Sequence, residues 1–459
     1  MCGSSFGPGN LLQNPGFESG LEFWYSNNVT LADTVPAEGT QVATMNGGVA
    51  CLSQDVALDL RPSALLLSFI AYTLPNVEDP GPLFAEVQWL DGEKIVIGSG
   101  LRIRMNEGMI TDRRITISDI TTRSPGGARY ARVLFSKGGS GDDQVALDQV
   151  LLVPVRSPNL LRNPGFEAGL SDWQAENFTS SYIAPLVNNG NALLTNADIG
   201  TLKQDISLSG QCPRSHYLLG FSLRSNLVAL PVFSLIWLDW RGEELGRGID
   251  EFISGGTLAS QDNFLSYLTV SGPAPLGAVS ARVLFSVVAV ENAGFSIDEV
   301  FLVNMESGNL VKNAEFADGL DFWQADYAKV VEGESAYTES HFAQFSLIGG
   351  SLFQLVELPP LSSGHSFLFS FAIRFSKRND ITKPMAEVRW LDIFGRDLGL
   401  AASVIPSLSG NDPLLWEVFV VSTGPAPNGA VAARVLFNKE ITVFGGNVDV
   451  DHVLLARLE

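Results

Sequence analysis

Charged side chains are scarce in this 459-residue chain, where they make up 17% of the residues, against about 25% in typical soluble domains. Basic residues are the scarcer kind, with 29 Lys and Arg against 50 Asp and Glu, so the formal net charge is −21. Binding to nucleic acid or to an anionic membrane needs clustered basic residues. The composition therefore argues against both partners.

Long hydrophobic runs are also missing. No apolar run approaches the roughly 18 residues needed to span a bilayer, and the longest candidates, such as residues 64–71, have the length of a strand. Residues 1–9 lack the basic and apolar regions of a secretory signal peptide. We therefore expect no membrane insertion, and a Gly-rich N-terminal tail that is not a leader.

Cysteine is rare, and the three copies do not occupy equivalent positions in the repeats described below. The sequence thus predicts neither a disulfide framework nor a zinc knuckle from Cys2, Cys51 and Cys212. Two readings stay open. All three can be incidental thiols, or Cys2, on its Gly-rich tail, can form a disulfide with another subunit.

Signatures of catalysis are missing as well. The four histidines fall at unrelated repeat positions and none has a His-Glu-x-x-His spacing. No Gly-x-Ser-x-Gly elbow or phosphate-binding loop is present. An aspartate recurs in every repeat, but a turn glycine follows it within three residues, so hairpin chemistry explains Asp91, Asp239 and Asp392. We therefore expect that the protein is not an enzyme.

What the chain does have is a segment written three times. Residues 10–21 read Asn-Leu-Leu-Gln-Asn-Pro-Gly-Phe-Glu-Ser-Gly-Leu, and the segment returns at 159–170 and, more divergent, at 309–320. A Trp follows each opening Asn by 14 residues, at Trp24, Trp173 and Trp323. A period near 150 residues is a whole domain and not a solenoid unit.

Each repeat reads as short strands separated by Gly, Pro, Asn and Asp turns, with no long amphipathic helix. This pattern predicts an all-β protein of three tandem β-sandwiches. The expected division is a tail at 1–9, domains at 10–153, 159–304 and 309–459, and linkers at 154–158 and 305–308. Linkers this short should hold the domains in a compact row or rod.

Three further motifs keep the same register. They are a Leu-x-Gln step first at 52–54, an Ala-Arg-Val-x-Phe strand first at 131–135, and a closing Asp-x-Val-x-Leu first at 148–152. Together with the opening segment they resemble the carbohydrate-binding-module jelly rolls of families 4, 9, 16 and 22. The resemblance covers nearly the whole chain and implies three jelly rolls. The same fold also occurs in bacterial surface proteins and in spore-coat and exosporium proteins.

The resemblance further implies a structural Ca²⁺ between the opening Glu and the closing Asp, which supply hard oxygen ligands. The implied pairs are Glu18 with Asp148 and Glu167 with Asp298. The third repeat has Ala317 in place of the Glu and keeps only Asp451, so no ion is expected there. The alternative is that these acids cap turns and bind backbone amides.

Sugar binding would need exposed aromatic rings to stack on pyranose faces. Six of the eight Trp recur in register and are expected in the core: Trp24, Trp89, Trp173, Trp237, Trp323 and Trp390. The remaining aromatic residues are the candidates for stacking. They are above all Trp240, Trp416, Tyr25 and Tyr182, with Tyr72, Tyr217 and Tyr327 also available.

Two functions of different class remain. The favoured one is a non-catalytic structural protein that assembles with itself into a layer or fibre on a bacterial cell or spore surface. Low charge, the lack of an enzyme domain and the tail Cys2 favour it. The alternative is an extracellular protein that binds a polysaccharide through one or more of its domains.

Overall fold

The computed structural model describes residues 9–33, 36–59, 61–74, 81–106, 108–139, 144–182, 185–194, 199–210, 214–225, 229–260, 264–289, 294–346, 348–377, 383–407, 415–440 and 446–458. Cys2 and Cys212 lie outside these residues, so the disulfide from Cys2 to another subunit stays a prediction. Cys51 is a free, half-buried thiol. No helix in the described part of the chain is long and apolar enough to cross a membrane.

The prediction of an all-β fold with three tandem jelly-roll sandwiches is confirmed. The first domain contains β1 (Tyr25–Asn27), β2 (Val29–Ala32), β3 (Val42–Met45), β4 (Ala50–Ala57), β5 (Ala64–Tyr72), β6 (Leu83–Leu90), β7 (Val96–Met105), β8 (Ile115–Ile120), β9 (Tyr130–Lys137) and β10 (Val145–Val155). These strands form two antiparallel five-stranded sheets, with the orders β1-β4-β9-β6-β7 and β2-β3-β10-β5-β8.

The second and third domains repeat both sheets strand for strand. The second contains β11 (Gln174–Glu176), β12 (Phe178–Ser181), β13 (Asn191–Leu194), β14 (Ile199–Ser207), β15 (His216–Ser225), β16 (Ala229–Leu238), β17 (Glu244–Phe252), the short helix α1 (Gly255–Ser260), β18 (Leu265–Val270), β19 (Ser280–Ala289) and β20 (Phe295–Met305). The third contains β21 (Gln324–Asp326), β22 (Ala328–Glu332), β23 (His341–Phe345), β24 (Gly350–Glu357), β25 (Phe367–Phe375), β26 (Pro384–Leu391), β27 (Asp397–Val404), β28 (Glu417–Ser422), β29 (Ala432–Lys439) and β30 (Val448–Arg457).

In each domain, side-chain hydrogen bonds of the opening segment connect the first residues of the domain to its last strand. Asn10 accepts hydrogen bonds from the backbone amides of residues 12 and 152 and donates one to the carbonyl of Val150. Asn14 binds the backbone of residues 19, 20 and 22, and its carbonyl accepts the indole N–H of Trp24 at 3.1 Å. Trp24 is buried against Phe17, as its position in the motif predicts. The same contacts recur at 159–173 and 309–323.

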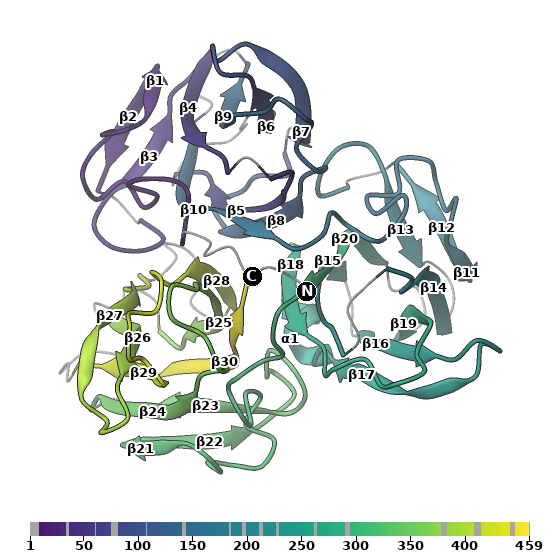
Figure 1. The fold of residues 1–459 in the computed structure, drawn as a ribbon, viewed down its shortest axis with the longest axis vertical. Coiled ribbons are helices and arrows are strands. Elements are labelled where there is room, and N and C mark those ends of the chain that lie inside the picture. The colour runs from purple at the N-terminus through teal and green to yellow at the C-terminus, as the bar shows by residue number, and fades with distance from the viewer. Residues whose placement is uncertain are drawn as a thin grey trace.

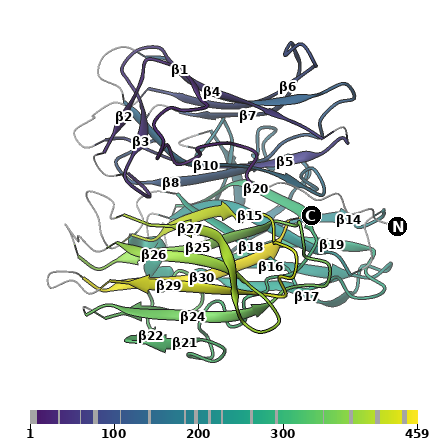
Figure 2. The ribbon, with the colours of Figure 1, turned by 60° about the vertical axis from the view of Figure 1, so that its left-hand side comes forward.

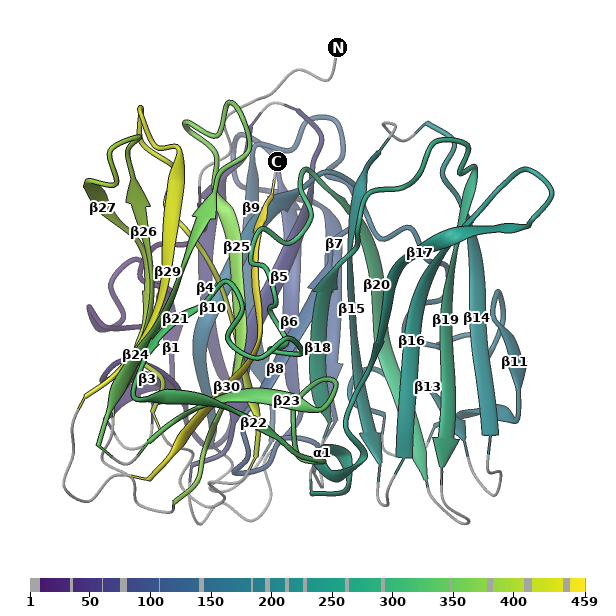
Figure 3. The same cartoon turned by 90° about the horizontal axis from the view of Figure 1, so that it is seen from below.

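The three sandwiches surround a central axis instead of forming the expected row or rod (Figure 1). In each domain the sheet that contains β5, β15 or β25 faces the axis, and the other sheet faces outward; Figure 2 shows the two sheets of the first domain as separate layers. Seen from the side, the strands run along the axis (Figure 3). We call these the inner and outer sheets.

The hydrophobic pattern explains this arrangement. The outer strand β9 alternates between buried and half-buried residues, as expected for a sheet with one face in water. In contrast, β5 and β25 are buried at every position, and β10 at every position except Pro154. The central strands of the inner sheets are therefore buried on both faces. Packing them around a common axis removes the second face from water, which a linear row would leave exposed.

Three quasi-equivalent backbone contacts join the domains into a closed ring. In each contact, a residue at the C-terminal end of β7, β17 or β27 forms an isolated β-bridge with the loop before the third strand of the next domain. The three pairs are Met105–Val187, Ile253–Thr338 and Pro406–Glu38. The last pair joins domain 3 back to domain 1. At the axis, Ser266 of β18 donates to the carbonyl of Thr116 in β8, whose hydroxyl donates to the carbonyl of Val418 in β28.

Candidate functional site

The two carboxylates predicted to hold Ca²⁺ in domain 1 both accept backbone hydrogen bonds. Asp148 is fully buried and accepts the amides of residues 37, 38 and 149 at 2.8–3.2 Å. Glu18 accepts the amides of Thr40 and Gln41 at 2.8 and 2.9 Å, and the hydroxyl of Thr40. These are the contacts of the alternative reading, in which the acids cap loops, and calcium binding stays a prediction.

Domain 2 repeats this arrangement. Asp298 accepts the amides of residues 186, 187 and 299, and Glu167 accepts those of residues 189 and 190. In domain 3, where Ala317 replaces the Glu, Asp451 still accepts three amides, from residues 337, 338 and 452. The aspartate therefore accepts the same three backbone hydrogen bonds whether or not the glutamate is present.

Buried acids gather at this end of each domain, where burial and neighbouring acids raise their pKa values. Burial raises the pKa of Glu38 to about 7, and the charge of Glu18 adds to the shift. Burial and then the charge of Glu38 raise the pKa of Asp148 well above its usual value. At the next junction, burial raises the pKa of Asp119 to about 6, and burial with the charge of Asp119 raises that of Glu299.

The structure divides the aromatic residues predicted to stack on sugars. Trp416 is buried, so its prediction as a stacking residue is wrong. Its ring packs near Tyr337 and Phe342 and 4.5 Å from the guanidinium of Arg374, and its N–H donates to the carbonyl of Ser335 at 2.9 Å. Tyr72 and Tyr217 are likewise buried. The exposed ones are Trp240, Tyr25, Tyr182 and Tyr327.

Tyr25 lies at a recess of about 610 Å³ on the outer sheet of domain 1, where residues of β1, β4 and β9 meet. Phe23 flanks it, and both rings are more than half exposed. Asp55 and Arg132 form a bidentate ion pair at 2.6 and 3.1 Å, and Lys94 reaches Asp55 at 3.2 Å. Hydrogen bonds from Arg132 lower the pKa of Asp55, so the carboxylate stays ionised as an acceptor.

The other two domains lack part of this combination. The strand pairings place Gln174 and Gln324 where domain 1 has Tyr25. Domain 2 keeps the ion pair as Asp205 with Arg282, and domain 3 has Leu355 in place of the acid. Domain 1 therefore combines an exposed tyrosine with the Asp55–Arg132 ion pair. The corresponding outer sheets of domains 2 and 3 do not combine these two features.

Tyr182 lines a second recess, of about 560 Å³, between domains 1 and 2. Arg104 and Asn106 contribute from domain 1, and Asn188 and Asn189 from domain 2. The polar groups of Asn106 and Asn188 already bond across the junction at 2.7 and 3.0 Å. Polar groups of this recess are therefore already used to join the two domains.

Comparison with known proteins finds distant similarity to solved structures. No protein-family model matches the chain, and no curated protein matches it. The enzymatically active domain of tailspike protein 4 from bacteriophage CBA120 is similar at 21% identity and a TM-score of 0.28, over 32% of this chain and 21% of the tailspike chain. This chain therefore matches about a fifth of the tailspike's length.

Isolated binding modules match over nearly their full length. The CBM22-1–CBM22-2 tandem domain of Paenibacillus barcinonensis Xyn10C is 15% identical, with a TM-score of 0.25, over 65% of this chain and 97% of the tandem. TmCBM61, solved with β-1,4-galactotriose, is 16% identical, with a TM-score of 0.25, over 32% and 99%. The domains resemble carbohydrate-binding modules. Likenesses this distant concern the fold alone.

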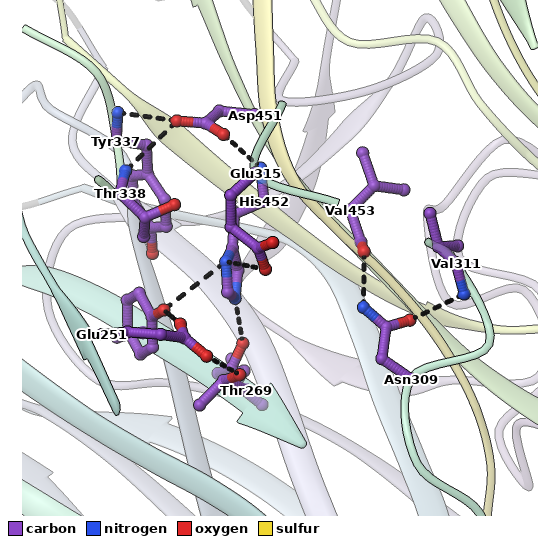
Figure 4. Close-up of polar contacts among 12 residues, drawn as sticks. Glu251, Thr269, Asn309, Val311, Glu315, Tyr337, Thr338, Asp451, His452 and Val453 are labelled. Carbon is purple, nitrogen blue, oxygen red and sulfur yellow. Dashed lines mark hydrogen bonds and ion pairs between the residues drawn. The ribbon is translucent and has the colours of Figure 1, made fainter. Parts of the chain in front are cut away.

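Sequence reasoning missed one cluster in these module-like domains. Glu251, Glu315 and His452 meet at the junction of domains 2 and 3, with ligand-capable atoms within 4.8 Å of one another (Figure 4). The signal was present as departures from the repeat, because Glu315 replaces the glycine of the opening motif and His452 follows the closing Asp. Glu251 lies in a different domain from Glu315 and His452, and no sequence motif links it to them.

Proposed function

We propose that the protein is a non-catalytic carbohydrate-binding protein that holds its glycan in the recess at Tyr25 on the outer sheet of domain 1. The observation that carries the proposal is an exposed aromatic pair beside a charged floor. The C–H face of a pyranose is apolar and packs on an aromatic ring, which has a large apolar surface. Sugar hydroxyls both donate and accept hydrogen bonds, and an ion pair supplies strong partners for each.

In this arrangement Tyr25 stacks on the sugar, Asp55 accepts hydroxyl hydrogens, and Arg132 and Lys94 donate to hydroxyl oxygens. The recess lies on the outward face of the ring, away from all three junctions, so a long chain can cross it without disturbing the fold. An extracellular location at a bacterial cell or spore surface is the matching setting.

Binding to a panel of soluble polysaccharides by affinity electrophoresis tests the proposal. Tyr25→Ala should weaken the binding of the retained glycan at least tenfold, roughly 1.4 kcal/mol. Asp55→Asn keeps the shape of this half-buried side chain, so it should weaken binding with only a small loss of melting temperature. Trp240→Ala is the matched control, since that exposed ring lies on a hairpin of domain 2 and should leave affinity unchanged.

Self-assembly into a layer or fibre is the competing reading, and it requires contacts between chains. Analytical ultracentrifugation at high concentration separates the two. A discrete species that binds glycan through Tyr25 supports our proposal. A protein that polymerises and retains no glycan, or one whose binding survives Tyr25→Ala, overturns it.

A further inference from the structure

The cluster of Glu251, Glu315 and His452 is built from two domains. Glu251 lies on β17 of domain 2, Glu315 in the opening segment of domain 3, and His452 on β30 where that strand bulges. His452 has a φ of 48°, and this left-handed conformation turns its side chain out of the strand and toward domain 2 (Figure 4). The cluster therefore depends on the closed arrangement of the domains.

The orientation of His452 is fixed from one side. Its Nε2 lies 2.8 Å from the carbonyl oxygen of Leu268, which only accepts, so Nε2 carries the hydrogen. The neutral ring then has a bare lone pair on Nδ1. That atom lies 3.6 Å from Oε1 of Glu315 and 3.4 Å from the hydroxyl of Tyr267. The side chain is buried, so the lone pair points into the cluster and away from solvent.

Glu251 is held by two hydroxyls of β18. Tyr267 donates to one carboxylate oxygen, and Thr269 donates to the other at 3.1 Å. Glu315 keeps 27% of its side-chain surface accessible, which leaves an entry path to the cluster. Burial raises the pKa of Glu315 to about 8, and the neighbours that add to the shift, Glu251 and Glu339, are both acids. The buried, acidic surroundings disfavour the ionised form of Glu315, and a bound cation would favour it.

The equivalent positions at the other two junctions carry different residues. Strand pairings and the repeat register match Glu251, Glu315 and His452 with Ile103, Gly165 and Glu299 at the junction of domains 1 and 2. At the junction of domains 3 and 1 the matching residues are Val404, Gly16 and Gln149. Neither alternative set could hold a metal ion, because each offers an aliphatic side chain and a glycine.

We propose that Glu251, Glu315 and His452 bind one divalent cation of the zinc class, which clamps domain 2 to domain 3. Zinc takes imidazole nitrogen together with carboxylate oxygen in sites of this kind. A ligating histidine commonly donates its other ring N–H to a carbonyl, as His452 does to Leu268. Calcium and magnesium prefer all-oxygen shells, so the histidine selects against them. Two carboxylates and a neutral imidazole balance the charge of the ion.

The test uses the full chain with Cys2, Cys51 and Cys212 changed to Ser, so that thiols do not compete for the metal. After dialysis against micromolar Zn²⁺ and then metal-free buffer, elemental analysis should find one Zn²⁺ per chain. Added Zn²⁺ should raise the melting temperature, because a ligand of the native state stabilises it by mass action. Ca²⁺ and Mg²⁺ at the same concentration should not.

His452→Gln and Glu315→Gly place at the cluster the residues that domain 1 carries there, so both variants are expected to fold. Each should lose the bound Zn²⁺ and the thermal shift. Glu299→Gln, at the matching position of the junction between domains 1 and 2, is the control and should keep one Zn²⁺. Failure of the parent to hold stoichiometric Zn²⁺, or an undiminished ion in His452→Gln, overturns the proposal. Neither result bears on glycan binding at Tyr25, which lies in domain 1.

Discussion

The junction of domains 2 and 3 and the junction of domains 3 and 1 share their backbone contacts and differ in their side chains. Each has one isolated bridge and a matching amide-to-carbonyl bond, from Glu339 to Phe252 in the first and from Gly39 to Ile405 in the second. Around this frame, the first has two acids and a histidine, and the second has a buried Arg114–Glu417 ion pair. The backbone contacts thus set the geometry, and the side chains are free to diverge.

The largest effect should come from breaking that ion pair. Arg114 binds Glu417 at 2.9 Å and also donates to the carbonyl of Pro36, and its side chain is 2% exposed. Arg114→Met leaves Glu417 buried without its partner and should cost about 3–5 kcal/mol of unfolding free energy. Denaturant titration measures the loss.

The matched control is an ion pair in water. Arg247 pairs with Asp250 at 2.7 Å, and both side chains are more than 40% exposed. Arg247→Met should cost less than about 1 kcal/mol. Equal losses in the two variants would show that the pair at the junction is no more important than one on the surface.

A smaller effect is expected at the junction of domains 2 and 3, where two tyrosines pack against each other across the interface. Tyr337 stacks on Tyr267 at 5.7 Å between ring centres, and its hydroxyl donates to the carbonyl of Ser266 in domain 2. Tyr337→Phe keeps the stack and removes the hydrogen bond, so it should cost about 1 kcal/mol or slightly more. Exposed Tyr327→Phe should be neutral, and a loss of the same size there would contradict this account.

The acids of the junction between domains 3 and 1 should make stability depend on pH. The pKa of Glu38 is raised to about 7 from its ordinary value of 4.5, mainly by burial, so the folded protein holds this proton more tightly than the unfolded chain does. The contribution of Glu38 to stability is therefore fully present below about pH 4.5 and is lost as the pH rises through about 7. Glu38→Gln should reduce this fall, giving a higher melting temperature than the parent at pH 8 and little difference at pH 5, both in excess chelator. A parallel pair of profiles would exclude Glu38 as the source.

The smallest effect should be that of calcium. If the ion binds between Glu18 and Asp148 and between Glu167 and Asp298, added Ca²⁺ should raise the melting temperature of the metal-free protein by a few degrees. Glu18→Gln combined with Glu167→Gln should abolish most of that rise. An unchanged melting curve on adding Ca²⁺ would leave these acids as loop caps.

Features that depend on local chemistry could be predicted from the sequence. The opening segment repeats because its asparagines bind nearby backbone, and Asp91 caps its own hairpin through the amides of residues 93 and 95. The burial of Trp24 followed from its fixed place in the repeat. Such contacts join residues that are close in the chain, or they recur in every domain. They can therefore be predicted from one sequence.

The ring and its junctions could not be predicted in this way. The continuous apolar run at 64–72 looks the same whether its second face meets a neighbouring domain or lies in an ordinary core. Trp416 was misjudged for a related reason, since the residues that contact its ring, Arg374, Tyr337 and Phe342, lie far from it in the chain. Glu251 and His452 are 201 positions apart and belong to different repeats, so their proximity appears only in three dimensions.

Closure of the ring within one chain has a consequence for biosynthesis. The contact between Pro36 and Ser407 spans 371 positions, so the flank of domain 1 that holds it has no partner until domain 3 has been made. Ile70 and Tyr72, which are buried beside domain 3 in the finished ring, stay accessible throughout that interval. During this time domain 3 of another molecule could occupy the open flank, in the manner of a domain swap. The covalent link keeps the correct partner at high local concentration, which favours closure over exchange.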